Sequence, residues 1–459
     1  MKMKSLKSFL LASIFLLILS TYNTYHVYAS GSSITYSQKT VSVGSNSIKL
    51  NILVISDSDN YSFKVVHNNP VGSVNDLKNL VAKVDGTAGV NGTFFDAYNS
   101  DSTKRYPYGI LIDNKNIIRG GTNVSFLSDG TLRFGKLNVV ITGSINGSYK
   151  WPNNWYAWNI NNVYKNNRQS VIFTSAFGKT PDDDSTNVIV SKGEVVEIVN
   201  EPVTPLRDGY VIHIGTGEKI KERFKIGDKV EYKVDFEMDG QPFSSDIVFA
   251  VGAGPKLLSN GNIDIDFERD GFSETKITSM RTARSFIGIN KDGSIIMGTT
   301  PKASIKELAS ALSQLGVTDA INLDGGASSG LYFQGKYITQ PGRQISNALV
   351  VVEKTFIEAS IVIEGNLLSQ NGLIKEGTTY VPLRGVLENL GIEITWNNLN
   401  KSVTCKKGEQ EFILSINSTK NSDGFMYESK SYVPLRLISE KFGYKVSWNS
   451  QTKQVEISK

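Results

Sequence analysis

The stretch from Ala320 to Gly330 constrains this chain more than any other, because an apolar run ends there in one carboxylate and a glycine-rich loop. Ala320–Leu323 leads into Asp324, and the loop that follows, Gly325–Gly330, has three glycines and two serines. Glycine packs no side chain and loses the most entropy on folding, so this loop is a poor core element. The pattern predicts a buried strand that delivers Asp324 to a binding site, with backbone amides facing an anion or a sugar. An ordinary turn between two strands is the alternative.

A helix is predicted just before this strand, over residues 303–315, because apolar residues recur there at helical spacing. Ser304 and Glu307 fit a capping box at its start, and Gly316 fits its C-terminal stop. The order is therefore helix, short turn, buried strand and glycine loop. No Gly-Lys-Ser/Thr follows, so the loop is not a phosphate-binding P-loop.

The first residues predict a secretory signal peptide over residues 1–29. Three lysines begin it, the apolar stretch Phe9–Leu19 is too short to span a bilayer, and Val27-Tyr-Ala29 suits cleavage. An uncleaved anchor is the alternative. We expect a secreted or cell-wall-associated protein with no membrane span after cleavage.

Composition narrows the chemistry. The chain has 49 Lys and Arg against 44 Asp and Glu, and the signal peptide removes three lysines, so about +2 remains and nucleic acid is not an expected partner. Cys405 is the only cysteine, which excludes an intrachain disulfide. Only 3 histidines are present, which argues against a Cys–His pair or a zinc site. We therefore expect carboxylates, amides, arginines and backbone donors to act without a cofactor or metal.

An internal repeat marks the C-terminal part. Tyr380–Arg384 recurs as Tyr432–Arg436 at an offset of 52 residues, and the same offset relates Trp396 to Trp448. Units of this length bury their faces against each other. Residues 360–459 are therefore predicted to form a small two-lobed α+β repeat domain, with the two tryptophans in matching environments.

These landmarks resemble the copper amine oxidase N-terminal-like domain. No copper site is expected, because the module has one cysteine and no histidine. Cys405 corresponds to Ile457 in the repeat, which predicts a small buried hydrophobic residue. A reactive thiol is the alternative.

Residues 30–354 are predicted to form a strand-rich mixed α+β domain, with a junction at 355–359. Short alternating strands and turns such as Asp239-Gly240 dominate this part, and a second helix is predicted near 73–84. Polar or glycine clusters lie at several predicted strand ends, where loops carry function, although each alone is compatible with a plain turn. They are Val90–Asp96, Tyr106–Gly109, Ala253–Pro255, Arg281–Ser285 and Arg343–Asn347.

Taken in order with the Asp324 loop, these segments resemble the phosphodiester glycosidase family over residues 85–352. The matching motifs are Asn-Gly-Thr-Phe-Phe, Gly-Ala-Gly-Pro, Arg-Thr-Ala-Arg, Asn-Leu-Asp-Gly-Gly and Arg-Gln-Ile-Ser-Asn-Ala-Leu. Ala327 stands where the family often has a third glycine. The resemblance implies a hydrolase that cleaves a sugar-1-phosphodiester, with a carbohydrate phosphodiester as its substrate.

The site residues are predicted on the same basis. Asp324, Arg284 and Asn91 are the predicted catalytic residues, and the predicted substrate-binding residues are Gly325, Gly326, Ser328, Arg343, Asn347, Phe95 and Gly254. Arginine suits bidentate phosphate contact, although a structural ion pair is the alternative for each arginine. Asp324 is predicted to act as nucleophile, base or acceptor from a sugar hydroxyl. Asn91 is predicted to hold a sugar hydroxyl or acetamido group, and Phe94 or Phe95 to cover the ring.

Other interpretations remain open. Asp266, Glu268 and Asp270 match half of a calcium loop, but Ile277 occupies its twelfth position, so a solvated acidic turn is favoured over a metal site. The preferred function is a secreted hydrolase acting in the cell envelope, with the repeats as a contact to a cell-wall polymer. The alternatives are a noncatalytic cell-wall polysaccharide-binding protein and a structural wall protein with a vestigial site.

Overall fold

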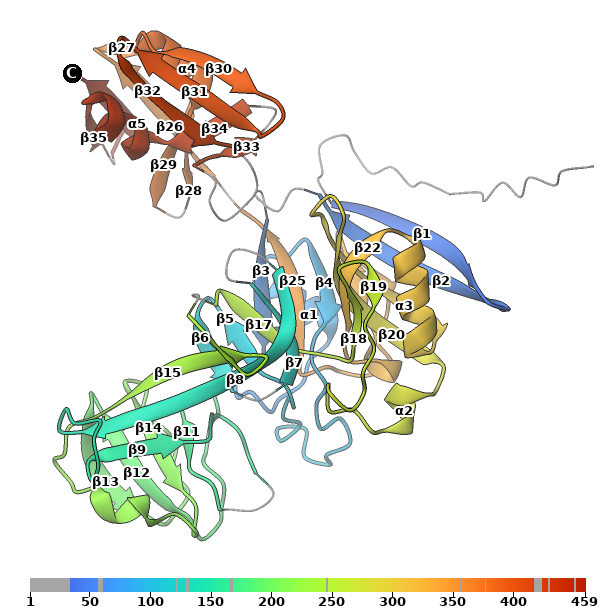
Figure 1. Cartoon of the computed structure of the whole chain (residues 1–459). Coiled ribbons are helices and arrows are strands. Elements are labelled where there is room, and N and C mark those ends of the chain that lie inside the picture. The colour runs from blue at the N-terminus through green and yellow to red at the C-terminus, as the bar shows by residue number, and fades with distance from the viewer. Residues whose placement is uncertain are drawn as a thin grey trace, which may run out of the picture.

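The computed structural model describes residues 34–56, 61–120, 123–128, 132–164, 168–244, 247–354, 356–375, 377–416, 423–427, 430–449 and 451–459. Figure 1 shows a strand-rich body with the C-terminal module set apart from it. The predicted signal peptide lies outside the described residues. None of the helices formed by the described residues has the length and apolar character that a membrane crossing requires.

The Asp324 strand lies inside a sheet that, in the described part of the chain, has 7 strands joined by antiparallel pairs. In spatial order they are β1 (Ile34–Val43), β2 (Asn46–Ile55), β21 (Ile295–Ala303), β20 (Thr282–Asn290), β22 (Val317–Asn322), β18 (Lys256–Ser259) and β19 (Asn262–Ile263). The antiparallel order agrees with the α+β prediction, since alternating β-α units would make parallel neighbours.

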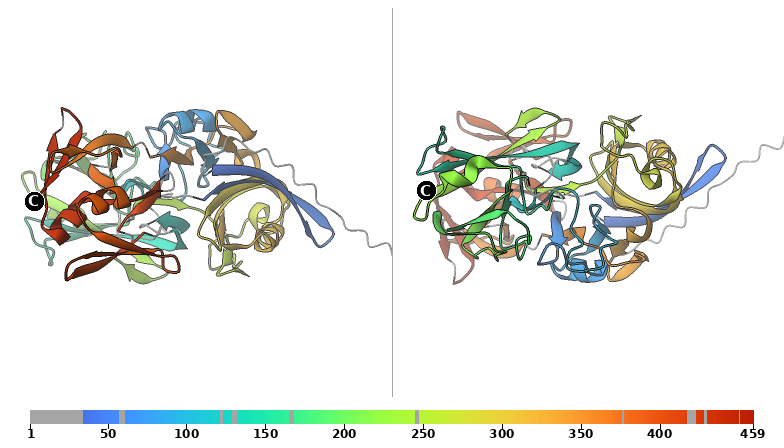
Figure 2. Two further views of the ribbon diagram at one scale, coloured as in Figure 1. Left: turned by 90° about the horizontal axis from the view of Figure 1, so that it is seen from above. Right: turned by 90° about the horizontal axis from the view of Figure 1, so that it is seen from below.

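The helix predicted before β22 is present as α3 (Ile305–Gln314). The Ser304 side chain accepts from the Glu307 amide and the Glu307 side chain accepts from the Ser304 amide, which completes the predicted capping box. Gly316 has φ +84°, a left-handed conformation that ends the helix as expected. The apolar face of α3 packs against this sheet beside the β1–β2 hairpin (Figure 2).

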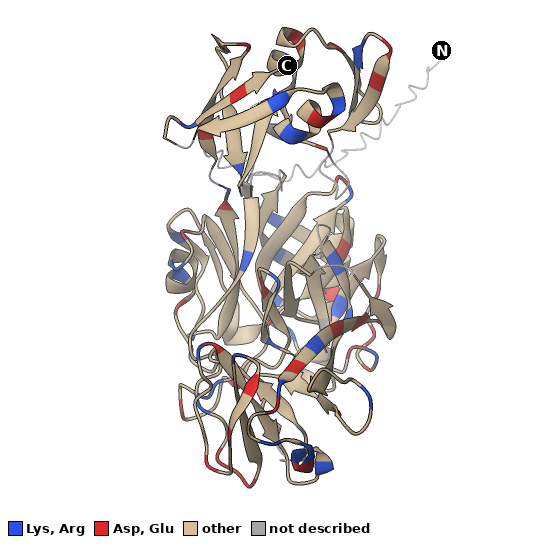
Figure 3. Cartoon of the chain, turned by 90° about the vertical axis from the view of Figure 1, so that its left-hand side faces the viewer, with Lys and Arg blue, Asp and Glu red and all other residues tan. Residues whose placement is uncertain are grey.

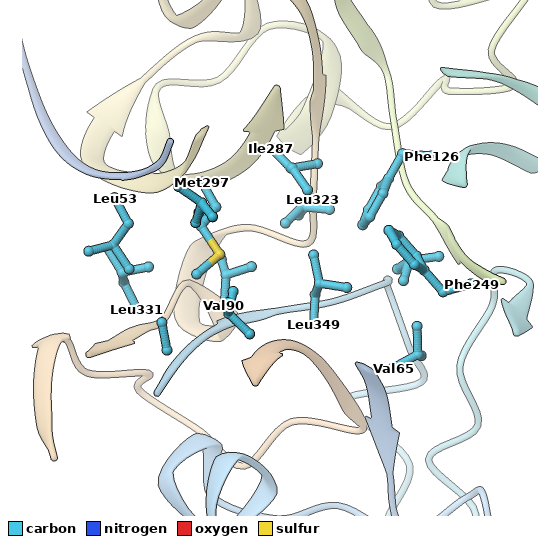
Figure 4. Close-up of a cluster of buried hydrophobic side chains, with 14 of the residues drawn as sticks. Leu53, Val65, Val90, Phe126, Phe249, Ile287, Met297, Leu323, Leu331 and Leu349 are labelled. Carbon is cyan, nitrogen blue, oxygen red and sulfur yellow. The ribbon is translucent and has the colours of Figure 1, made fainter. Parts of the chain in front are cut away.

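A second sheet of 5 strands among the described residues faces the first. Its strands are β24 (Lys336–Thr339), β23 (Leu331–Phe333), β4 (Ala88–Asn91), β25 (Asn347–Glu353) and β3 (Tyr61–His67). The helix predicted near 73–84 is the shorter α1 (Leu77–Ala82), which packs on this sheet through Leu77, Leu80 and Val81. Figure 4 shows the core between the two sheets, where Ile287 and Leu323 lie opposite Leu349.

Two further sheets complete the body. One has 8 strands within the described residues: β16 (Gln241–Phe243), β15 (Val230–Met238), β8 (Leu132–Ile145), β7 (Asn123–Ser128), β17 (Phe249–Gly252), β5 (Leu111–Asp113), β6 (Asn116–Arg119) and β9 (Asn154–Ala157). The other has 5 there: β10 (Asn159–Ile160), β11 (Val171–Phe173), β14 (Gly209–Ile214), β12 (Thr186–Ser191) and β13 (Glu194–Val199). The short helix η1 (Lys219–Arg223) packs through Ile220 into the core beside β14. Basic and acidic residues are interspersed along the chain (Figure 3).

The C-terminal module contains both copies of the repeat. Its larger sheet has, among the described residues, β33 (Phe425–Tyr427), β34 (Lys430–Pro434), β29 (Thr378–Pro382), β28 (Gly372–Lys375), β26 (Ile357–Ile363), β36 (Gln454–Ser458), β35 (Lys445–Asn449) and β27 (Asn366–Leu367). Its smaller sheet has β30 (Glu393–Asn397), β31 (Ser402–Lys407) and β32 (Gln410–Ser415). The helices are α4 (Leu383–Asn389) and α5 (Leu435–Phe442).

The repeat is visible in the structure, but the two separate lobes are not confirmed. Each copy runs strand, helix, strand, strand, and β29 of the first pairs with β34 of the second. One hydrophobic core takes residues from both copies, including Leu387 and Ile438. Because neither copy has a core of its own, the two depend on each other.

The matching environments of the two tryptophans are confirmed. Trp396 pairs in register with Val403 and is 42% exposed, while Trp448 pairs with Val455 and is 44% exposed. Cys405 is fully buried in the module's core, as predicted. Burial raises the pKa of its thiol to about 11, so the thiolate is scarce at neutral pH.

The body and the module should fold independently. The hydrophobic clusters found among the described residues fall either within 34–352 or within 356–457. A chain ending at Lys354 should therefore unfold in a single cooperative transition on heating, measured by calorimetry. An insoluble or noncooperative truncated chain would show that the two parts stabilise each other.

Candidate active site

Asp324 lies where the two facing sheets are joined by main-chain hydrogen bonds. The amide of Leu323 donates to the carbonyl oxygen of Ser285 on β20 at 2.9 Å, and the amide of Asp324 donates to that of Gly92 at 3.1 Å. Gly92 directly follows β4, a strand of the other sheet. The end of β22 is thus held from both sides, which gives Asp324 a defined position.

The carboxyl group of Asp324 titrates unusually close to neutrality. Asp324 keeps part of its surface exposed, yet burial is the largest influence and raises its pKa to about 6. A hydrogen bond from the Ser328 hydroxyl, one from the Gly325 amide at 2.8 Å and the charge of Arg343 act in the opposite direction. Because the effect of desolvation on the pKa exceeds these opposing effects, the carboxyl group exchanges a proton near physiological pH.

Asn91 holds the main chain around Asp324. It is buried, and its Nδ2 donates to the carbonyl oxygen of Asp324 at 2.8 Å. Its Oδ1 accepts from the Ser285 hydroxyl at 2.7 Å and from the Gly330 amide at 3.0 Å. Both ends of the amide are therefore used to position the loop. A direct contact with a sugar stays a prediction.

Arg284 is buried and binds the segment that contains α2 (Thr275–Thr278). Its Nη2 donates to the carbonyl oxygens of Lys276 at 2.9 Å and Met280 at 2.7 Å, and its Nε donates to that of Ala303 at 3.2 Å. Burial lowers its pKa. These bonds give Arg284 a structural role, and its predicted phosphate contact stays a prediction.

One guanidinium nitrogen of Arg284 still faces the loop. Nη1 has no hydrogen-bond partner among the described residues, and a Cβ built on Gly325 would lie 3.8 Å from it. Arg284 is therefore next to the Asp-Gly-Gly segment, as the sequence predicted.

Arg343 approaches Asp324 from the other end of the loop. The amide of Gly342 donates to the carbonyl oxygen of Ala327 at 2.8 Å, which ties this segment to the loop. The Arg343 guanidinium lies 4.9 Å from the ring centroid of Tyr98, and its Nη2 donates to the Tyr98 oxygen at 3.3 Å. The sequence does not single out Tyr98 or its neighbour Lys276, because a lone tyrosine and a lone lysine in polar segments carry no local pattern.

Asn91, Arg284, Asp324 and Arg343 come from segments far apart in the sequence and lie near one another in the structure. Asn91 bonds to Asp324, Arg284 lies beside Gly325, and the charge of Arg343 acts on the carboxyl group of Asp324. The structure confirms that strand ends distant in sequence converge here. The catalytic role of each residue stays a prediction.

Asn347 and Gly254 frame this site through the main chain. Asn347 is buried, and its Oδ1 accepts from the Thr93 amide at 3.0 Å. Gly254 donates through its amide to the carbonyl oxygen of Asn322 at 2.7 Å and accepts from the Asn322 side chain at 2.8 Å. A Cβ on Gly92 would lie 2.0 Å from the Asn347 oxygen, so this position requires glycine. Substrate contacts of Asn347 and Gly254 stay predictions.

The remaining predicted binding residues differ in accessibility. Phe95 is only 6% exposed, whereas Phe94 is partly exposed and packs near the ring of Phe272 at 5.7 Å. Phe94 is thus the more accessible of the two aromatic rings. Gly325, Gly326 and Ser328 form the turn after Asp324, where η2 (Gly326–Ser328) begins. Their contacts with substrate stay predictions.

The acidic segment near Asp266 is occupied by protein contacts. Arg269 forms ion pairs with Asp264 at 2.6 Å and with Asp270 at 2.7 Å, and Asp270 also accepts from the Lys256 amide. Across the described residues, no group of three or more His, Cys, Asp or Glu side chains is placed to hold a metal ion.

Two parts of the chain match known protein families. Residues 173–352 match the phosphodiester glycosidase family, and residues 362–457 match the copper amine oxidase N-terminal domain. The chain therefore contains a phosphodiester glycosidase domain followed by a copper amine oxidase N-terminal domain. The first match includes Arg284, Asp324 and Arg343, whereas Asn91 and Phe95 lie before it. No curated protein matches the sequence significantly.

Solved structures share the fold. A hypothetical protein from Synechocystis superposes with a TM-score of 0.61 at 22% identity, over 70% of this chain and 62% of that one. A protein from Burkholderia pseudomallei K96243 superposes with a TM-score of 0.57 at 18% identity, over 67% of this chain and 74% of that one. The zebrafish N-acetylglucosamine-1-phosphodiester alpha-N-acetylglucosaminidase catalytic domain gives a TM-score of 0.38 at 14% identity, over 70% of this chain and 83% of that one, too low to support a structural argument.

Replacing Asn91 by Ala should destabilise the protein. The substitution leaves the Asp324 carbonyl, the Gly330 amide and the Ser285 hydroxyl without their partner in a buried place. We expect a loss of roughly 2–4 kcal/mol in the free energy of unfolding, measured with urea. Asn116→Ala, at the exposed start of β6, is the matched control and should change little. Equal stability of the two variants would contradict the positioning role.

Replacing Asp324 by Asn should stabilise the protein at neutral pH. The folded-state pKa of about 6 lies above the ordinary value of 3.8, so the folded protein binds the proton more tightly and loses stability as pH rises through that window. Asparagine does not ionise and avoids this loss. We expect a gain of roughly 1–2 kcal/mol at pH 7.5, after allowance for solvent screening, and almost none at pH 3.5. Urea unfolding at both pH values checks this, and a lower stability of the variant at pH 7.5 would contradict it.

Proposed function

We propose that this protein is a hydrolase that cleaves the bond between an anomeric sugar carbon and a phosphodiester. The observation that supports it best is the carboxyl group of Asp324, with a pKa of about 6, beside the cation of Arg343. Both lie within the stretch that matches the phosphodiester glycosidase family. A carboxylate beside a cation suits a substrate that has a sugar on one side and a phosphate on the other.

The chemistry assigns different tasks to the two groups. Cleavage at the anomeric carbon develops positive charge on the sugar, which a carboxylate stabilises. The phosphate leaves with the bonding electron pair, and a nearby cation stabilises its negative charge. Phosphate is a good leaving group, so little proton donation is needed. Water supplies the hydroxyl group that the sugar gains and the proton that the products release.

Asp324 acts in its ionised form in this proposal. As nucleophile, as base for water or as acceptor from a sugar hydroxyl, it needs a free electron pair on an unprotonated carboxylate. Asp96, partly exposed on the segment that follows Gly92, is the next candidate for a carboxylate role. Its Oδ2 accepts from the Asn99 side chain at 3.1 Å.

We further propose that the protein acts outside the cell, secreted or bound to the cell wall. The exposed tryptophans of the C-terminal module, Trp396 and Trp448, favour contact with a polymer, because an exposed indole offers a flat apolar face beside polar groups. A hollow beside Trp448 is lined by Asn449, Gln451 and Glu456 among others. This observation also supports the alternative of a noncatalytic cell-wall polysaccharide-binding protein.

Turnover of a sugar-1-phosphodiester tests the proposal. Asp324→Asn should lower kcat/KM by at least about a hundredfold, equivalent to roughly 2.7 kcal/mol. The wild-type rate should fall tenfold per pH unit below about pH 6, because protonation removes the active form. Asp208→Asn, at an exposed position, is the control and should turn over normally. Near-normal turnover by Asp324→Asn would move the role to Asp96, and absence of turnover with retained polymer binding would favour the noncatalytic alternative.

A further inference from the structure

Two cations beside the site are not neutralised by a carboxylate. Arg269 and Arg281, which precede and follow α2, are both paired, Arg281 with Glu307 at 2.8 Å. Lys276 on α2 and Arg343 form no ion pair with a carboxylate among the described residues. Two cations without an ion-pair partner, one of which acts on the Asp324 carboxyl group, indicate a place for an anion.

Both cations converge on Tyr98. The Arg343 guanidinium carbon lies 4.9 Å from the ring centroid and the Lys276 Nζ lies 5.4 Å from it. Because both distances share one centre, the two cations are no more than about 10 Å apart. Hydrogen bonding and charge from Arg343, together with the charge of Lys276, lower the pKa of the Tyr98 phenol. The two positive charges thus meet at the Tyr98 side chain, whose phenolic oxygen accepts a hydrogen bond from Arg343.

The surrounding framework positions the main-chain segments that carry both cations. Arg284 donates to the carbonyl oxygens of Lys276 and Met280, so it positions the segment that carries the Lys276 ammonium. The Gly342 amide bonds to the loop that follows Asp324, so it positions Arg343. Tyr98 has no such restraint, since its side chain is 77% exposed and can turn away without opening a core.

We propose that Lys276 and Arg343 form a two-cation clasp for the phosphate of the substrate, and that the Tyr98 phenolic oxygen occupies the place of a phosphate oxygen in the unliganded protein. This inference rests on the proposed function and names the groups that recognise the leaving side of that substrate. A phosphodiester carries a full negative charge, so it is a stronger acceptor for the two cations than a neutral phenol. It therefore displaces Tyr98 on binding.

The clasp makes a specific demand on the substrate. A glycoside with a neutral leaving group offers no charge to Lys276 and Arg343, so it leaves Tyr98 in place. Arg284 is a positioning residue in this scheme, since it acts on the phosphate through the α2 segment. Lys276 and Tyr98 join Arg343 as specificity-determining residues.

Binding of dimethyl phosphate, a minimal phosphodiester, tests the clasp without turnover. We expect calorimetry at low ionic strength to show Kd raised by about fivefold or more in Lys276→Gln and in Arg343→Gln. Lys306→Gln, at an exposed position on α3, is the matched control and should stay within about twofold of wild type. Tyr98→Phe should bind at least as tightly as wild type, because it removes the competing oxygen.

Each other result overturns a part of this inference. Unchanged binding by Lys276→Gln, or no binding by wild type, contradicts the clasp. Weaker binding by Tyr98→Phe contradicts the placeholder role of the phenol. The clasp and the proposed function can fail separately. If Lys276→Gln loses dimethyl phosphate binding but the wild-type protein does not turn over a sugar-1-phosphodiester, the clasp alone is supported. Turnover that depends on Asp324 but not on Lys276 supports the hydrolase alone.

Discussion

The hydrogen bonds between the end of β22 and the end of β4 are the interaction on which the site depends. The Asp324 amide bonds to Gly92, and the Asn91 side chain bonds back to the Asp324 carbonyl. These two contacts join two sheets whose facing sides share one apolar core. Without them the loop would have glycine's freedom and no defined place for its carboxylate. Buried amide groups that satisfy main-chain atoms therefore carry the geometry of this site.

The ionised form of Asp324 is unfavourable for the stability of the fold but is required in the proposed reaction. Burial disfavours its charge and raises its pKa to about 6, while the ionised form is the one that acts on substrate in the proposed reaction. The nearby charge of Arg343 recovers part of the ionised form without neutralising Asp324 through a close ion pair. Arg284, which also lies beside the loop, instead donates its hydrogen bonds to carbonyl oxygens. Two arginines that look equivalent in the sequence thus have different partners. The charge of Arg343 acts on the Asp324 carboxyl group, whereas Arg284 binds main-chain carbonyl oxygens.

The C-terminal module shows how a repeat can form one structural unit. The antiparallel pair of β29 and β34 places the two copies about a common centre, so their helices contribute to one core. The equivalent tryptophans then remain outside that core on separate strands. Sharing a core allows each copy to be short, because a unit of this size buries too little apolar surface alone.

The sequence by itself determined the local elements and the internal repeat. The capping box and glycine stop of α3, the buried strand before Asp324, the buried Cys405 and the repeat follow from periodicity and residue type, which act over a few neighbouring positions. Tertiary structure decided what each polar side chain does. Asn91 and Asn347 bond to main-chain atoms, Arg284 binds carbonyl oxygens of the α2 segment, and Tyr98 lies close to both Lys276 and Arg343. The physical reason is that hydrogen-bond partners and burial are set by segments far apart in the chain, so no local pattern encodes them.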